Sequence, residues 1–262
     1  MSQYKYKPLL PNKIRMIKLN ERKSKIGVEH FGKTMKINGS IANFIESLPD
    51  VLAGHDLREF ILKCKQARAR HKPIIAALGA HVIKVGLNPV IVDLMKKGWI
   101  NALSFNGAGI IHDFEISYCG HTSEDVDEYI TDGRFGMADE TGKYLNRAIS
   151  EAKGKMGIGE AVGKMIDGSD FPYKQYSLFA NAYKLNIPAT VHVAIGTDTI
   201  HFHPEVDGEA IGSCTQRDFF LFCSLVKKLD KGGVFFTIGS AVVLPEIFLK
   251  AVTFVRNLGT PL

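Results

Sequence analysis

The sequence lacks the features that mark several large classes of protein. Its four cysteines, in 262 residues, include no C-x-x-C pair, so we interpret them as reduced thiols rather than as disulfides or zinc ligands. No apolar run approaches the roughly 20 residues that span a bilayer. The N-terminus carries lysines without the apolar core of a secretory signal. These absences predict a soluble cytoplasmic protein without a membrane partner.

Several catalytic and nucleotide-binding motifs are missing as well. No G-x-S-x-G elbow, P-loop or H-E-x-x-H occurs, which argues against a serine hydrolase, a P-loop nucleotide hydrolase and a zincin. The ordinary dinucleotide fingerprint G-x-G-x-x-G is also incomplete, because His112 stands where its third glycine would fall.

Positive charge is concentrated at the N-terminus. Residues 1–36 carry ten Lys or Arg and two Glu, a net charge of +8, whereas the whole chain carries +6, so the rest sums to −2. We expect an extended basic arm over residues 1–36, which contains Pro8 and Pro11, and a single α/β domain over residues 37–262. The arm suits nucleic acid. Packing on a neighbouring subunit is the favoured alternative, because the arm has few aromatics and no known reader motif.

Short apolar runs alternate with amphipathic segments in the body of the chain. Runs without polar alternation predict buried strands at residues 74–78, 100–105, 188–195 and 234–238. Helical spacing predicts helices around residues 41–48, 57–64, 87–97, 144–153, 158–166, 177–185, 217–229 and 245–257, with Ser40 and Thr215 as N-caps. This order predicts a parallel sheet with helices on both faces.

A small-residue turn follows each predicted strand, at Gly79, residues 106–109, residues 196–198 and residues 239–241. Such turns meet at the carboxyl ends of parallel strands, where ligands bind. The second turn leads into a helix start near Ala108 and His112, whose N–H groups and dipole suit an anion. The alternative, that its glycines serve only the steric needs of a strand-to-helix turn, stays open.

Titratable side chains near these turns are candidates for chemistry. His112 and Asp113 follow the second turn and could transfer protons, since imidazole titrates near pH 6.5. A plain polar lining of the pocket is the alternative for His112. Asp198, in the third turn, could reach a ribose hydroxyl.

Two further clusters have weaker signals. His201 and His203 alternate on an extended segment, but H-x-H without a third fixed ligand is more typical of ordinary histidines, so no metal site is predicted. An acidic cluster suits a cationic ligand such as a polyamine, and equally a solvated helix start; it comprises Glu124, Asp125, Asp127 and Glu128.

Several segments, taken in order, resemble the deoxyhypusine synthase family, and more closely its prokaryotic synthase-like branch. They are FNGAGIIHDFEI (105–116), GHTSEDVDEYITDGRFGMADETG (120–142), IPATVHVAIGTD (187–198) and GGVFFTIGSAVV (232–243), together with residues 80–86. The resemblance runs from about Ile74 to Asn257, and several segments in one order are more specific than a single glycine motif.

The resemblance implies an NAD-binding, Rossmann-like fold that assembles as a homotetramer with active sites between subunits. In the family, NAD oxidises spermidine, and the aminobutyl imine passes to an enzyme lysine and then to a protein lysine or another amine. The implied NAD contacts are Ala80, His81, Asn106, Gly107, Ala108, Asp198, Gly239 and Ser240. With this transferase in mind we assign His112 and Asp113 to catalysis, and His201 and Glu124 to the substrate.

Three departures separate the sequence from the true synthases. Ile111 and His112 stand where two acidic residues help to hold spermidine, and a histidine expected after the fourth turn is replaced near Leu244. No lysine matches the imine-forming lysine of the family, whose segment would follow the last matched helix. Either the chain is truncated or the covalent step is missing. The alternative function is therefore a non-catalytic or regulatory NAD-binding module, and translation initiation factor 5A is a doubtful acceptor.

Overall fold

The computed structural model describes residues 3–262. The chain divides into two compact units, of which the first ends at Ile61 and the second begins at Leu62. This boundary falls inside helix α2 (Leu52–Ala69). The division predicted at residue 36 stays a prediction. Among the described residues no helix is both long enough and apolar enough to cross a membrane.

The first unit consists of exposed, irregular chain followed by helices. Three short 3-10 turns interrupt the irregular part: η1 (Pro11–Lys13), η2 (Leu19–Glu21) and η3 (Val28–His30). Helix α1 (Ile41–Ser47) begins after Ser40, whose hydroxyl accepts a hydrogen bond from the Asn43 N–H, as its N-cap role predicts. Pro49 lies between α1 and α2, because proline cannot continue a helix.

The second unit is built on a four-stranded parallel sheet. Its strands are β1 (Ile74–Leu78), β2 (Ala102–Asn106), β3 (Ala189–His192) and β4 (Val234–Ile238), in the order β3-β2-β1-β4. Ile75 pairs with Ala102 on one side and with Phe235 on the other, and Leu103 pairs with Ala189. The predicted parallel α/β sheet is therefore confirmed.

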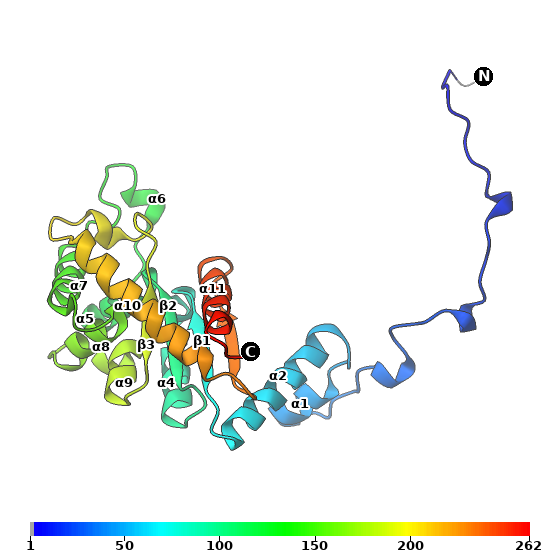
Figure 1. The fold of residues 1–262 in the computed structure, drawn as a ribbon, viewed down its shortest axis with the longest axis horizontal. Helices are drawn as coiled ribbons and strands as arrows, with labels where there is room; N and C mark the ends of the chain where they lie inside the picture. The colour runs from blue at the N-terminus through cyan, green and yellow to red at the C-terminus, as the bar shows by residue number, and fades with distance from the viewer. Residues whose placement is uncertain (1–2) are drawn as a thin grey trace. The chain divides into compact units, whose positions relative to one another are not determined.

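Helices connect the strands in sequence. Helices α3 (His81–Lys84) and α4 (Asn88–Lys96) link β1 to β2, and the long connection to β3 contains α5 (Ala108–Cys119), α6 (Val126–Tyr129), α7 (Asp139–Ala152), α8 (Ile158–Asp167), η4 (Lys174–Tyr176) and α9 (Leu178–Lys184). After β3 come η5 (Thr199–Phe202), α10 (Gly208–Lys227) and, beyond β4, α11 (Val243–Asn257). The segment that carries α6 projects from this unit (Figure 1).

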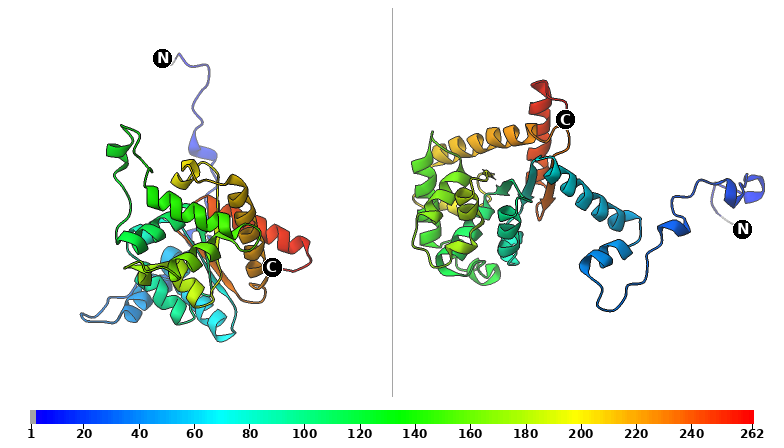
Figure 2. Two further views of the ribbon diagram at one scale, coloured as in Figure 1. Left: turned by 90° about the vertical axis from the view of Figure 1, so that its left-hand side faces the viewer. Right: turned by 90° about the horizontal axis from the view of Figure 1, so that it is seen from below.

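Alternate residues of the central strands enter two separate apolar cores. Leu78 and Phe105 lie in the larger core, with α4, α5, α7, α8 and α9, which gather on one side of the sheet (Figure 1). Ile75 and Ala102 lie in the smaller core, with α11 and the second half of α10, which meet on the other side (Figure 2), whereas the first half of α10 packs in the larger core. Because both faces are covered, β1 is apolar and buried throughout, as predicted, whereas β2 and β3 include buried polar residues such as Ser104 and Thr190.

Helix α10 corrects one sequence prediction. We expected Thr215 to cap a helix over residues 217–229, but α10 begins at Gly208 and Asp207 is its N-cap. The Thr215 hydroxyl instead donates to the Val191 carbonyl (2.8 Å) and accepts from the Val193 N–H (3.1 Å). The first turns were missed because glycine and polar residues interrupt their apolar spacing.

Asp218, on the inner face of α10, ties strand β3 to the start of α8. Its Oδ2 accepts hydrogen bonds from the N–H groups of Val191 (2.9 Å) and Gly159 (3.1 Å). Burial raises the pKa of Asp218 from 3.8 to about 7, although these N–H groups act in the opposite direction. The protonated form is therefore favoured by folding.

Replacing Asp218 by asparagine is expected to cost more stability in acid than at neutral pH. The folded pKa lies above the unfolded value, so the stabilisation from this carboxyl is fully present below about pH 3.8 and is lost as the pH rises through about 7. The gap in unfolding free energy between wild type and variant should widen by about 3 kcal/mol from about pH 7 to about pH 4. Urea unfolding at both pH values measures it, with the exposed Asp127→Asn as control. A constant gap would contradict the assignment.

Candidate functional site

The turns at the carboxyl edge of the sheet contact one another in pairs. Gly79, after β1, donates its N–H to the Ile238 carbonyl (2.8 Å), and a Cβ on Gly79 would lie 2.0 Å from the Gly239 carbonyl oxygen. After β2, a Cβ on Gly107 would lie 2.0 Å from Oδ2 of Asp198. Contacts within the protein therefore explain on steric grounds why both positions are glycine, whatever ligand binds nearby.

The second turn is tighter than predicted. Strand β2 continues through Asn106 and α5 begins at Ala108, so Gly107 alone joins them, in a helical conformation. The first N–H groups of α5, which have no partners within the helix, therefore start directly at the end of β2. Oδ1 of Asn106 is buried there and has no hydrogen-bond partner among the described residues.

Asp198 and His201 form a buried pair next to Gly107. The His201 Nδ1 accepts hydrogen bonds from the N–H groups of Gly196 (3.1 Å) and Asp198 (3.3 Å), so the neutral ring carries its proton on Nε2. That Nε2 lies 3.7 Å from the Asp198 Oδ2, and both side chains are 4% exposed. Burial raises the pKa of Asp198, and a positive charge on the His201 ring would oppose that shift. Neither atom has a hydrogen-bond partner within the described chain.

A cavity of about 740 Å³ opens along α5 and the segment that carries α6. This volume is typical of small-molecule pockets, which span about 300–1,000 Å³. Aromatic rings and carboxylates dominate its lining: Phe114, Tyr118, Tyr129 and Phe135, with Glu115, Glu124, Asp125, Glu128, Glu140 and Asp198. Lys84 is its sole Lys or Arg within the part of the chain that the structure describes. Such a lining attracts cations by charge and through aromatic faces.

A chain of hydrogen bonds runs along the wall of this cavity. Nδ1 of His112 lies 2.6 Å from the Thr122 hydroxyl oxygen, and that hydroxyl donates to Oε2 of Glu115. The Thr141 hydroxyl donates to Oε1 of the same carboxylate (3.1 Å). Burial, followed by the charges of Lys84 and His81, lowers the pKa of His112 to about 4. His112 is therefore neutral near pH 7.

Asp113 is fully buried and does not line this cavity. Its Oδ1 accepts the Leu178 N–H (2.7 Å), and its Oδ2 accepts the Ser177 hydroxyl (2.5 Å) and the Phe179 N–H (3.3 Å). Burial raises its pKa to about 6, although these donors act in the opposite direction. Asp113 thus holds the N-terminus of α9, a structural role, and its part in proton transfer stays a prediction.

The structure brings only some of the predicted site residues to the cavity. Ala108, His112, Glu124 and Asp198 line it, and Glu124 accepts the Gly136 N–H (2.9 Å). His201 reaches it only through Asp198. The remaining predicted NAD contacts lie at the strand-end turns outside its lining: Ala80, His81, Asn106, Gly107, Gly239 and Ser240.

Sequence reasoning missed the partners of His112. Glu115, Thr122 and Thr141 carry no motif, and Tyr118 and Cys119 line the cavity without one. The available signal was the spacing of His112 and Glu115, which places them on one face of a helix. Thr122 follows α5 within ten residues of His112, but Thr141 is 26 residues from Glu115, and only the fold brings it to the same carboxylate.

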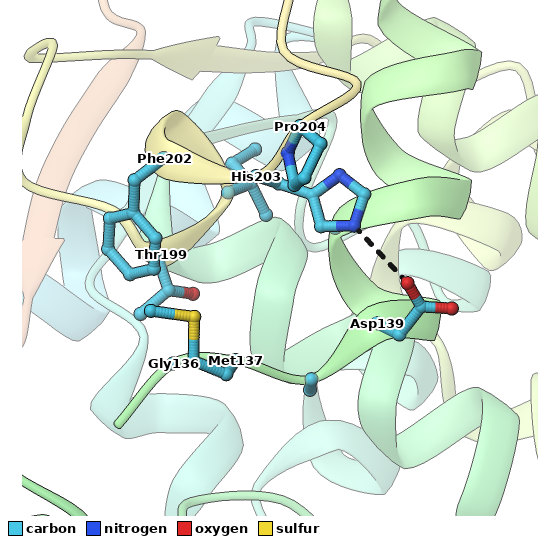
Figure 3. A pocket seen from close by; sticks show the side chains of 10 residues that line it. Gly136, Met137, Asp139, Thr199, Phe202, His203 and Pro204 are labelled. Carbon is cyan, nitrogen blue, oxygen red and sulfur yellow. Dashed lines mark ion pairs between the residues drawn. The ribbon is translucent and has the colours of Figure 1, made fainter. Parts of the chain in front are cut away.

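A second cavity, of about 140 Å³, lies beside η5 (Figure 3). Met137 and Phe202 line it, and Nε2 of His203 lies 3.6 Å from Oδ1 of Asp139 (Figure 3). His192 lies apart from this pair, with its ring centroid 5.3 Å from that of Phe222. Across residues 3–262 no three His, Cys, Asp or Glu side chains converge as metal ligands.

Comparison with known protein families and with curated proteins finds no match. Similar solved structures include the arginine dihydrolase ArgZ of the ornithine-ammonia cycle in Cyanobacteria, at 16% identity and a TM-score of 0.47 over 78% of this chain and 26% of that one. A second is a putative deoxyhypusine synthase from Entamoeba histolytica, at 11% identity and a TM-score of 0.34 over 71% of this chain and 56% of that one. A third is AgrE in complex with ornithine and NAD+, at 14% identity and a TM-score of 0.44 over 76% of this chain and 28% of that one. This chain thus spans between 26% and 56% of their lengths. These likenesses assign neither a family nor an activity, and the α/β class rests on the sheet itself.

Proposed function

We propose that this chain is an NAD-dependent aminoalkyl transferase of the deoxyhypusine synthase type, which acts on a polyamine or related amine through an imine. The observation that carries the proposal is the cavity lined by carboxylates and aromatic rings, which reaches Ala108 and Asp198 at the strand ends. Ammonium groups bind carboxylates through charge-assisted hydrogen bonds and bind aromatic faces through cation–π attraction. The sequence resemblance supports the reaction type.

Residues at the strand ends fit a dinucleotide cofactor. Oδ1 of Asn106 and Oδ2 of Asp198 are buried without hydrogen-bond partners in the described chain, and ribose hydroxyls would satisfy them. The unpaired N–H groups at the start of α5, beginning near Gly107 and Ala108, would hold the pyrophosphate. NAD, when bound, supplies the hydride acceptor for oxidation of the amine.

The residues of this chain would then bind and orient the amine. Carboxylates of the cavity hold its ammonium groups, and the rings of Tyr118 and Phe114 exclude water from its methylenes. Neutral His112 lines the same wall as a polar contact. No lysine corresponds by position to the imine-forming lysine of the family, and among the described lining residues Lys84 is the one lysine.

NAD is expected to raise the melting temperature of the protein in a saturable manner. A ligand that binds only the folded state stabilises it by RT ln(1 + [L]/Kd), about 2.7 kcal/mol at 100 times Kd. With NAD and spermidine together we expect reduced cofactor, measured by absorbance, and aminobutyl transfer to an added amine, measured by mass spectrometry. Absence of both products with each of several polyamines would overturn the transferase proposal.

A non-catalytic or regulatory NAD-binding module is the second candidate. It is favoured by Ile111 and His112, which replace the acidic pair of the true synthases, and by the structural position of Asp113. Stabilisation by NAD without any turnover would support it. Turnover that disappears in His112→Ala, with folding and NAD binding intact, would exclude it.

A homotetramer and a protein-lysine acceptor belong to the transferase proposal. Sedimentation velocity of the full chain tests the first, and mass spectrometry of candidate acceptor proteins after reaction tests the second. Deletion of residues 1–36 tests the third hypothesis, that the basic arm binds nucleic acid. This hypothesis requires that the full chain bind nucleic acid and that the deletion abolish the binding.

A further inference from the structure

Glu115 is an acceptor that is already engaged by donors on both of its oxygens. The Thr122 hydroxyl donates to Oε2, and the Thr141 hydroxyl donates to Oε1 at 3.1 Å. The backbone N–H of Ser123 adds a further hydrogen bond to this carboxylate. Burial and the charge of Glu124 raise the pKa of Glu115, while these three donors act in the opposite direction. Both carboxylate oxygens accept hydrogen bonds in this arrangement, so neither gives a proton back to Thr122.

The direction of the remaining hydrogen bond follows from a count of protons. A threonine hydroxyl has one proton, and Thr122 donates it in the hydrogen bond to Glu115. The contact of 2.6 Å between Thr122 Oγ1 and His112 Nδ1 therefore needs a proton from the histidine. A neutral imidazole that carries its proton on Nδ1 has a lone pair on Nε2.

We propose that Glu115, acting through Thr122, fixes His112 as the Nδ1–H tautomer, so that Nε2 accepts a hydrogen bond from an ammonium group in the cavity. Glu115 and Thr122 are positioning residues in this arrangement, and His112 is the residue that touches the ligand. The inference rests on the proposed amine-binding function for its ligand, although the tautomer itself does not depend on any ligand.

The surroundings of His112 agree with an Nε2 that accepts a hydrogen bond. His112 lines the cavity and its side chain is 17% exposed, and no protein group within the described chain hydrogen-bonds to its Nε2. The carboxylates around it are acceptors as well, so the wall offers acceptors to a ligand rich in N–H donors. The low pKa of His112 keeps the ring neutral, which agrees with a lone pair on Nε2.

The test reads the tautomer directly, by ¹⁵N NMR of the histidine side chains in the full-length protein without ligand. His112 is assigned by the resonances that vanish in His112→Gln. We expect a protonated Nδ1 and an unprotonated Nε2. In Glu115→Gln the amide NH₂ can donate to Thr122, whose hydroxyl then turns to donate to Nδ1, and the proton moves to Nε2.

The matched control is Glu140→Gln, which removes a carboxylate from the same cavity without touching His112. It should leave the tautomer unchanged. Calorimetric titration with spermidine should show about tenfold weaker binding for Glu115→Gln than for Glu140→Gln, because only the former turns Nε2 into a donor that faces an ammonium. Equal affinities in the two variants would overturn the role assigned to Nε2.

Other outcomes separate this inference from the proposed function. A proton on Nε2 in the wild type, or an unchanged tautomer in Glu115→Gln, overturns the inference whatever the protein binds. The expected tautomer and its switch without any spermidine binding would instead count against the amine function. If Glu115→Gln does not fold, Thr122→Val breaks the same hydrogen-bond chain without a change of charge, and His112 should then populate both tautomers. Thr122→Ser should restore the single Nδ1–H tautomer. The exposed Thr131→Val should leave the tautomer of His112 unaltered.

Discussion

Replacement of Asp113 by alanine is expected to lower the unfolding free energy by about 3–5 kcal/mol, because three buried donors lose their acceptor and each unsatisfied donor costs about 1–3 kcal/mol. The change leaves the Leu178 and Phe179 N–H groups and the Ser177 hydroxyl without their acceptor in a site closed to water. It also removes the acceptor that holds the hydroxyl of Ser177, the N-cap residue of α9. Urea unfolding followed by circular dichroism measures the loss.

The size of this effect decides between two roles of the same residue. Asp113→Asn keeps one acceptor oxygen and should cost less than alanine, and the exposed Asp127→Ala serves as the matched control. A variant that unfolds like the wild type but loses turnover would contradict the structural role and restore Asp113 to proton transfer. A destabilised variant whose folded fraction retains NAD binding would support the structural role of Asp113 at the start of α9.

Substitution of Gly107 by alanine is expected to weaken NAD binding by about a hundredfold while the fold persists. The added Cβ would lie 2.0 Å from Oδ2 of Asp198, so the carboxylate must move. A hydrogen bond to a charged group is worth about 1.5–3 kcal/mol, and the shift removes it from the proposed ribose contact. Isothermal titration with NAD measures the affinity, and thermal unfolding reports the fold.

The control for Gly107 is another helical glycine with open space around it. Gly212, within α10, meets no atom within 4 Å of an added Cβ, so Gly212→Ala should bind NAD like the wild type. The double variant Gly107→Ala with Asp198→Gly has no clash but also has no carboxylate, so it should bind NAD as weakly as Gly107→Ala does. Full NAD affinity in Gly107→Ala would show that Asp198 does not contact the cofactor.

These predictions treat the strand ends and the acidic cavity as one binding region. Asp198 belongs to both, since it contacts Gly107 and also lines the cavity. A cofactor at the turns and an amine among the carboxylates would therefore meet beside this residue. Loss of NAD binding without loss of spermidine binding, or the reverse, would tell which half of the region a variant has damaged.

Much of the fold could be predicted because its signals are local. The apolar runs of β1 and β4 match the observed strands, and helices on both faces follow from strands that lack polar alternation. The start of α10 could not be predicted, because Gly212 and nearby polar residues hide its period although Ala210 and Ile211 are buried. The start of this helix is set by the burial of its first turns, and burial is a property of the packed chain.

The candidate site divides in the same way. The sequence by itself determined the order of strands and turns, and hence that Gly107, Asp198 and Gly239 would gather at one edge of a sheet, because the carboxyl ends of parallel strands must lie together. Only the tertiary structure decided that Asp113 turns into the core while its neighbour His112 faces a cavity. Adjacent helical residues differ by about 100° in direction, and which direction is buried depends on α9 and the loop of Thr122, whose contacts with α5 no local pattern encodes.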